Sequence, residues 1–166
     1  MHDLILIGLP ASGKTSVGRA LARRLDMPFY DCDEAVETAA GQSVSAIFSQ
    51  HGETFFRDME SKILEDLCSR ERCVIATGGG AVLRQENRLL LRRSGGVFWL
   101  DRPLEDIMST DFQTGRPLLA EGRQALERLA AARRGLYASC ACHRIPEPLL
   151  EKAVEDIENI WRGENI

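Results

Sequence analysis

The sequence lacks the features that mark membrane proteins and nucleic-acid-binding proteins. No apolar run in its 166 residues approaches the ~20 residues that a membrane-spanning helix needs. Positive charge is not in excess, because 21 Lys and Arg stand against 25 Asp and Glu, which gives a net charge of −4. This balance argues against a nucleic-acid partner. The apolar pattern begins at Leu4, which leaves no room for a signal peptide. We therefore expect a cytoplasmic protein with no membrane and no nucleic-acid partner.

A disulfide or metal framework is also missing from the pattern. The five cysteines are an odd number and are scattered, as is usual for reduced thiols in a cytosol. Cys140, Cys142 and His143 could be three metal ligands, but no second cluster completes such a site. Alternation in a short strand explains the two cysteines equally well. A chain of this length can bury a core without such cross-links, so we predict one domain over residues 1–166.

A glycine-rich stretch, Gly8–Thr15, fits the phosphate-binding pattern G-x-x-x-x-G-K-[ST] in full. It follows a short apolar run of strand type, Leu4–Ile7, and precedes apolar residues at helical spacing. On such a turn, backbone N–H groups and the helix N-terminus both point at an anion. The alternative is a chance glycine-rich turn, and the strand and helix context argues against it. We predict a nucleotide-binding loop in which Lys14 reaches the outer phosphates and the Thr15 hydroxyl binds Mg²⁺.

The next expected strand covers residues 27–30. Two carboxylates, Asp31 and Asp33, follow at its end. In an extended segment, residues i and i+2 point to the same side, so both carboxylates would face one place. The carboxyl ends of parallel strands line the ligand crevice of α/β folds. One acid would then suit a metal and the other a substrate hydroxyl. The alternative is a solvated pair in which Asp33 is the N-cap of the following helix.

Further along the chain, a charged pair lies on a long helix. Ser43 is the expected N-cap of a helix that breaks at Gly52, and a second helix covers about 53–69. Arg57 and Glu60 stand three residues apart there and can meet on one face. The spacing is equally compatible with an ordinary surface pair and with a functional one.

The remaining elements place glycines and arginines near the expected site. A buried strand over 73–77 runs into Gly78, Gly79 and Gly80, which would allow positive φ and let a ligand approach the backbone closely. Strands are expected at 96–100 and 141–145, and a final helix ends near residue 161. Periodicity fails over about 109–122, which suits a mobile flap. An arginine on such a flap would exclude water and neutralise phosphate charge.

Five short segments, in this order, resemble the shikimate kinase family of P-loop proteins. They are Phe29–Asp33 with Val36-Glu37, Gly52–Glu60, Gly78–Gly80, Gly115–Leu119, and Arg133 ahead of Leu136-Tyr137. The resemblance implies an α/β three-layer P-loop fold. Its five-stranded parallel sheet would have the order 2-3-1-4-5, with flanking helices and a lid at about 109–122.

The resemblance also implies a reaction, in which ATP phosphorylates the 3-hydroxyl of shikimate in the pathway to chorismate and the aromatic amino acids. It implies Mg²⁺ as cofactor and a monomeric enzyme. Thr15 would hold the metal directly and Asp31 through water, while Lys14, Asp33 and Arg116 would be catalytic. The residues expected at the ATP phosphates are Pro10, Ala11, Ser12, Gly13, Lys14, Thr15, Ser16 and Arg116. Those expected at shikimate are Asp33, Arg57, Glu60, Gly78, Gly79, Gly80 and Arg133.

The chain departs from the family pattern at four places. Relatives usually carry glycine where this loop has Ala11, and proline where it has Gly135. They commonly have an arginine just before the lid, whereas residues 108–111 of this chain are Met-Ser-Thr-Asp. The loop over 144–148, which normally helps to hold the adenine, is short. We therefore expect a weak hold on the base. The alternatives are a gluconate kinase, a nucleoside-monophosphate kinase and a non-catalytic nucleotide-binding module.

Overall fold

The fold was analysed in a computed structural model that describes residues 3–109, 122–147 and 149–164. The expected lid, including Arg116, therefore lies almost wholly outside the described residues. The elements are β1 (Asp3–Ile7), α1 (Lys14–Leu25), β2 (Phe29–Asp31), α2 (Cys32–Ala40), α3 (Val44–Cys68), β3 (Val74–Ala76), η1 (Ala81–Leu83), α4 (Gln85–Ser94), β4 (Gly95–Leu100), α5 (Leu104–Ser109), α6 (Arg123–Cys140), β5 (His143–Ile145) and α7 (Leu150–Glu164).

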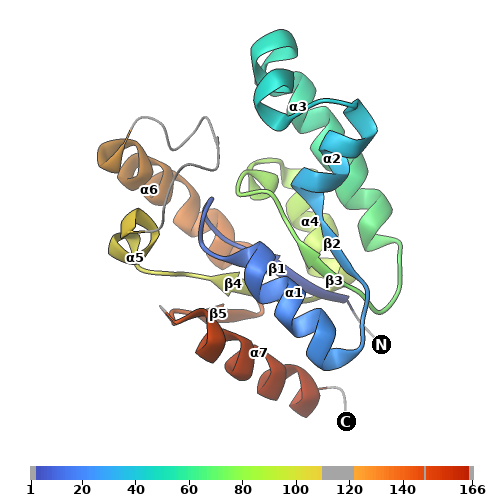
Figure 1. Ribbon diagram of the computed structural model, residues 1–166, viewed down its shortest axis with the longest axis vertical. Helices are drawn as coiled ribbons and strands as arrows, with labels where there is room; N and C mark the ends of the chain where they lie inside the picture. Colours follow the sequence, from blue (N-terminus) through green and yellow to red (C-terminus); the bar gives the residue numbers. More distant parts are fainter. Residues whose placement is uncertain (1–2, 110–121, 148, 165–166) are drawn as a thin grey trace.

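The strands form one parallel sheet in the order β2-β3-β1-β4-β5, as the resemblance implied (Figure 1). The central strand β1 is buried along its whole length and pairs Ile5 with Ile75 on one side and with Val97 on the other. Parallel strands end at the same edge of a sheet, so the carboxyl ends of β1, β2 and β3 lie together. The phosphate loop, the acidic turn and the glycine tripeptide follow those three ends.

Helices cover both faces of the sheet, because alternate residues of each strand point to opposite sides. Leu4 and Leu6 pack with apolar residues of α1 and α7. Ile5 and Ile7 pack with apolar residues of α3, α4 and α6. Figure 1 shows α1 and α7 side by side on the first face. These layers confirm the three-layer α/β architecture.

A small third hydrophobic cluster packs α2 against α3. Val36 of α2 packs with Ile47 and Phe56 of α3. Helix α3 is broken at Gly52, whose backbone (φ 81°, ψ 173°) is not helical, and Ser43 caps its start through a hydrogen bond from the Ala46 N–H. Both features confirm the expected break and cap. The bend turns the first half of α3 towards α2 (Figure 1).

Three expectations about local structure were wrong. Helix α2 begins at Cys32, so Asp33 lies inside its first turn and Asp31 is the N-cap. Cys140 is the last residue of α6, so strand alternation does not account for it. None of the three adjacent glycines, 78 to 80, has positive φ.

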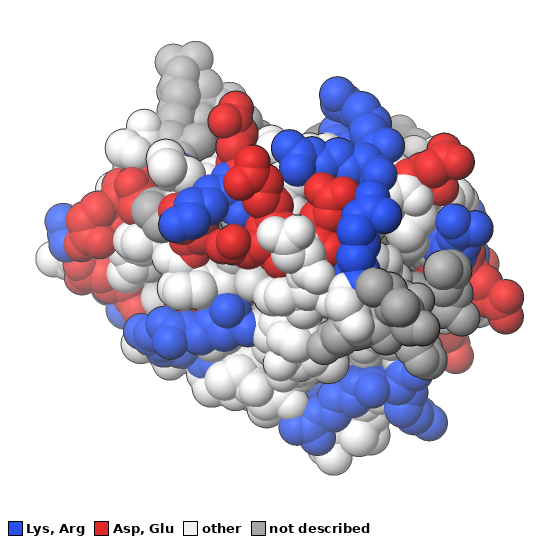
Figure 2. Space-filling view, turned by 90° about the horizontal axis from the view of Figure 1, so that it is seen from below, with Lys and Arg blue, Asp and Glu red and all other residues white. Residues whose placement is uncertain are grey.

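Two further observations concern the molecule as a whole. No helix in the described ranges is long and apolar enough to cross a bilayer. On the face seen in Figure 2, acidic and basic side chains are mixed, with arginines and lysines in several separate groups.

Candidate functional site

The phosphate loop has the expected position between β1 and α1. Gly8 and Gly13 have φ of 148° and 95°, and Ala11 has φ of 60°, in the left-handed region that disfavours a side chain by about 1–2 kcal/mol. Lys14 is 5% exposed, and its Nζ donates hydrogen bonds to the carbonyls of Gly8 at 3.0 Å and Leu9 at 2.7 Å. The amine is thus held at the mouth of the loop, where an outer phosphate could replace those carbonyls.

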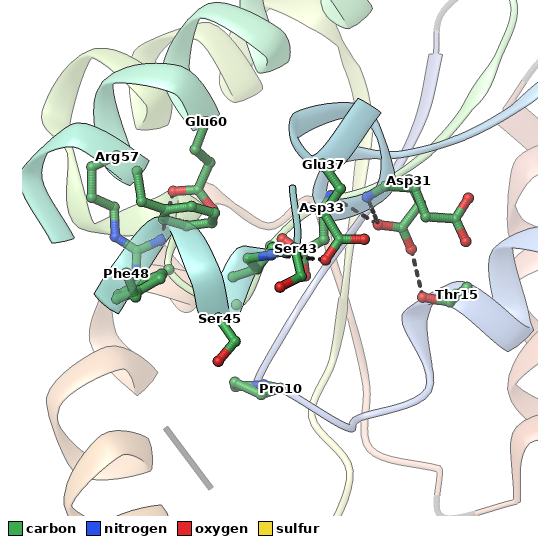
Figure 3. A pocket seen from close by; sticks show the side chains of 16 residues that line it. Pro10, Thr15, Asp31, Asp33, Glu37, Ser43, Ser45, Phe48, Arg57 and Glu60 are labelled. Atoms are coloured by element: carbon green, nitrogen blue, oxygen red, sulfur yellow. Dashed lines mark hydrogen bonds and ion pairs between the residues drawn. The ribbon is translucent and has the colours of Figure 1, made fainter. Parts of the chain in front are cut away.

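A pocket of about 580 Å³ opens beside this loop (Figure 3). It lies between the carboxyl edge of the sheet and helices α2 and α3. Its walls are formed by Pro10, Thr15, Asp31, Asp33, Glu34, Glu37, Ser43, Val44, Ser45, Phe48, Phe56, Arg57, Glu60, Gly78, Gly79 and Gly80. Most of the residues expected at a metal or at shikimate therefore meet in one cavity.

The two acids are brought together by a strand-to-helix turn. Asp31 Oδ1 accepts hydrogen bonds from the N–H groups of Asp33 at 2.9 Å and Glu34 at 3.4 Å, and its Oδ2 accepts one from Thr15 Oγ1 at 2.6 Å. Asp31 therefore caps α2 and also contacts the end of the phosphate loop. A hydroxyl and a carboxylate oxygen are the hard donors that suit Mg²⁺, so the residues present fit this metal. Asp33 lines the same pocket.

Arg57 is held between two glutamates on α3. Its Nη1 donates to Glu60 Oε2 at 2.7 Å, and its Nε and Nη2 each donate to Glu53 Oε1 at 3.2 Å. Arg57 is 6% exposed and Glu60 is 1% exposed, so the pair is not an ordinary surface pair. Burial raises the pKa of Glu60 above its ordinary value, and the neighbouring Arg57 charge offsets part of this shift. Sequence reasoning missed Glu53 as a partner, although its i, i+4 spacing from Arg57 was a usable signal.

Two buried polar atoms of this region are left without a hydrogen-bond partner among the described residues. They are Glu60 Oε1 and Arg133 Nη1. Arg133 lies on α6, is 4% exposed and is close enough to Glu60 to lower its pKa. Arg133 is not among the described residues that form the pocket wall. Unpaired buried polar atoms are costly, so they point to a missing partner such as a bound ligand.

The three glycines at 78–80 are required because neighbouring groups leave no room for a side chain. A Cβ on Gly78 would overlap Glu60 Oε1, and one on Gly80 would overlap the Arg57 guanidinium. A Cβ on Gly79 would lie 2.7 Å from Pro10 Cδ. The chain therefore approaches the charged side chains and the phosphate loop closely. Of the two predicted reasons, positive φ is wrong. The close approach of a ligand to this backbone stays a prediction.

An aromatic wall completes the pocket, and sequence reasoning missed it. Phe48 and Phe56 have ring centroids 4.7 Å apart and both line the cavity. At helical spacing they were indistinguishable from core residues. Ser45 also lines the cavity (Figure 3).

A second, smaller pocket of about 230 Å³ lies at the carboxyl ends of β4 and β5. Arg144 lines it, donates to Asp101 Oδ2 at 2.6 Å and lies over the Trp99 ring at 5.5 Å. Arg144 is a nearby arginine that could take the place of the missing pre-lid arginine, and here it is held against Asp101 and Trp99. Residues 110 and 111, in the stretch where relatives carry the arginine, lie outside the described residues.

Comparison with known proteins agrees with this geometry. The family model described as "Shikimate kinase" matches residues 10–160. A shikimate kinase of Symbiobacterium thermophilum is 47% identical over 148 residues, which are 86% of this chain and 85% of that protein. One of Burkholderia thailandensis is 45% identical over 142 residues, which are 84% and 77% of the two chains.

Solved structures agree as well. Shikimate kinase from Acinetobacter baumannii in complex with shikimate superposes with a TM-score of 0.95 at 32% identity, covering 100% of this chain and 96% of that one. A gluconokinase from Sinorhizobium meliloti reaches a TM-score of 0.59 at 18% identity, covering 99% and 94% of the two chains, and shares the fold alone. The match of family, sequence and structure over nearly the whole chain has one consequence: this chain belongs to the shikimate kinase family.

Proposed function

We propose that this chain transfers the γ-phosphoryl group of ATP to the 3-hydroxyl of shikimate. One observation carries the proposal. A single pocket joins the Thr15–Asp31 hydrogen bond at the phosphate loop to the buried Arg57–Glu60 pair. The first end suits a nucleotide phosphate with its metal, and the second suits a small carboxylate. Between them lies Asp33, where a substrate hydroxyl would sit.

On the phosphate side, Lys14 and the loop amides bind and orient the triphosphate. Thr15, and Asp31 through water, would hold Mg²⁺, which supplies charge neutralisation on the transferred group. Lys14 is already desolvated, so its charge is little screened when phosphate oxygens replace the Gly8 and Leu9 carbonyls.

On the acceptor side, the chain positions a hydroxylated carboxylate. Arg57 and Arg133 would bind the shikimate carboxylate with their guanidinium forks, and Glu60 orients Arg57. The Asp33 carboxylate would accept a hydrogen bond from the 3-hydroxyl and take its proton as the phosphoryl group arrives. The rate then depends mainly on alignment and on charge neutralisation.

Arg116 is assigned by the family pattern, on a lid over about 109–122. We expect it to reach the γ-phosphate when the lid closes. Arg116→Ala should therefore reduce kcat strongly while the KM for ATP changes little, because the contact forms only in the closed state.

The deciding experiment measures ADP release with MgATP and, in turn, shikimate, gluconate and AMP. The proposal expects turnover with shikimate alone. Asp33→Asn should reduce kcat by ~100-fold or more, since a positioned general base contributes about that much. Asp58→Asn, an aspartate outside the pocket wall, is the matched control and should behave as wild type. Turnover with gluconate or AMP, or none with shikimate, would refute the assignment.

A further inference from the structure

A buried tyrosine on α6 contacts the glycine tripeptide and has no part in the reaction described above. Tyr137 is 1% exposed, and its Oη donates a hydrogen bond of 2.5 Å to the Gly79 carbonyl. Its ring packs on Trp99 with centroids 5.9 Å apart. Burial raises the pKa of Tyr137 to about 12, with Arg133 opposing the shift, so the hydroxyl remains a donor at neutral pH.

The tripeptide needs such a contact because glycine restrains its own backbone least. The Gly78 carbonyl accepts from the Ala81 N–H at 3.1 Å, and the Gly80 carbonyl accepts from Leu83 N–H at 3.0 Å. The following turn therefore fixes the first and third carbonyls. The middle carbonyl, that of Gly79, is fixed from another element, by Tyr137.

The consequence follows from peptide planarity. The Gly79 carbonyl and the Gly80 N–H belong to one planar unit, so fixing one fixes the other. A peptide between two glycines can flip at little steric cost, because each glycine tolerates both signs of φ. A flip would reverse the Gly79 carbonyl and the Gly80 N–H next to the Arg57 guanidinium, which a Cβ on Gly80 would overlap. It would also change the part of the tripeptide that lines the pocket.

Tyr137 also relates the two arginines to each other. It lies one helical turn after Arg133, and its hydroxyl reaches the tripeptide that seats Arg57. We propose that Tyr137 is a positioning residue for the acceptor site: it holds the Gly79–Gly80 peptide so that Arg57 and Arg133 stand at the spacing that one carboxylate requires. This inference rests on the proposed function, because it concerns the same carboxylate.

The test is Tyr137→Phe, which removes the hydroxyl and keeps the ring on Trp99. We expect the KM for shikimate to rise about three- to tenfold, the effect of one lost hydrogen bond, and the KM for ATP to stay within about twofold. Tyr30→Phe is the matched control, since Tyr30 is the second of the two tyrosines and lies outside the pocket wall. It should leave both constants unchanged.

A double-mutant cycle shows whether Tyr137 acts through Arg57. If it does, Tyr137→Phe should add little to the effect of Arg57→Ala. The inference would be overturned if the two single substitutions raised the shikimate KM by factors that multiply in the double variant. An equal rise in the KM for shikimate and for ATP, or an unchanged shikimate KM, would overturn it as well. A purely structural role would lower the melting temperature and leave the KM ratio unchanged. Wild-type protein that does not phosphorylate shikimate would instead refute the function, so the two failures are distinguishable.

Discussion

At the scale of single residues, Arg133 combines deep burial with an Nη1 that has no hydrogen-bond partner in the described part of the chain. If this atom binds the substrate carboxylate, Arg133→Ala should raise the KM for shikimate by roughly 10- to 150-fold, since hydrogen bonds to charged groups contribute about 1.5–3 kcal/mol. The KM for ATP should stay within about twofold. Steady-state kinetics with each substrate varied checks this. Arg128→Ala, on the same helix and exposed, is the control; equal rises for both substrates would contradict the role.

The same scale decides what Arg144 can do for the nucleotide base. Its guanidinium is engaged by Asp101 and lies over Trp99, so it is not placed to stack on a base. An arginine stacked on a base contributes about 0.5–2 kcal/mol, and this chain lacks the one before the lid. We expect kcat/KM for ATP, GTP and CTP to differ by less than about tenfold, and Arg144→Ala to leave those ratios unchanged. An ATP preference that disappears in Arg144→Ala would show that Arg144 leaves Asp101 to hold the base.

At the scale of elements, the bend in α3 decides the shape of the pocket. Gly52 has φ of 81° and ψ of 173°, a region almost restricted to glycine, so Gly52→Ala should lower the free energy of unfolding by about 1–3 kcal/mol. Relaxing the strain would move Phe48 and Ser45, which line the pocket, and raise the KM for shikimate. Urea unfolding and kinetics measure the two effects.

The matched control for this change is Gly135→Ala on α6. A Cβ at either glycine would meet no atom of the described residues within 4 Å, so the two substitutions differ in backbone conformation and not in crowding. Gly135 lies inside a helix without positive φ, and alanine there should stabilise the fold by about 0.5–1 kcal/mol. Similar losses of unfolding free energy in the two variants would show that the backbone conformation at position 52 does not strain an alanine.

At the scale of the whole molecule, a buried carboxylate on the central strand makes stability depend on pH. Asp3 is 4% exposed, and burial raises its pKa above 3.8 despite a hydrogen bond of 3.1 Å from the Cys73 N–H. The folded state therefore holds this proton longer than the unfolded chain does. The contribution of Asp3 is fully present below about pH 3.8 and is lost as pH rises through the folded pKa.

Asp3→Asn keeps an oxygen acceptor for Cys73 and removes the titration. The free energy of unfolding of the variant, relative to wild type, should therefore increase as pH rises above about 4 and then level off. Urea unfolding over pH 4–8 measures this difference. Asp66→Asn, at an exposed carboxylate on α3, controls for the change in net charge. A difference that is constant with pH, or that falls, would contradict the expectation.

The expected monomeric state also belongs to the scale of the whole molecule and stays a prediction. Light scattering coupled to size-exclusion chromatography would test it. A species of twice the 18.5 kDa chain mass would contradict it.

The local sequence pattern was sufficient to predict a structural feature wherever all the residues that form it are contiguous in the chain. Gly8–Thr15 predicts a phosphate loop because the motif, the preceding strand and the following helix are contiguous. Ser43 and Gly52 mark a cap and a break for the same reason, and the structure confirms both. The order of the strands came from the family resemblance, because pairing between strands depends on contacts that periodicity does not contain.

Tertiary structure decided everything that depends on burial. Spacing left Arg57 and Glu60 equally compatible with a surface pair and with a functional one, and only the packing of α3 against the sheet shows that the pair is buried. Asp31 and Asp33 were correctly placed together, but a helix cap rather than strand alternation joins them. The glycines at 78–80 were predicted to let a ligand approach the backbone, whereas the groups that the structure brings against them belong to Glu60, Arg57 and Pro10. A sequence shows which residues can bind or react, whereas distances between segments far apart in the chain arise only when the core forms and removes those side chains from water.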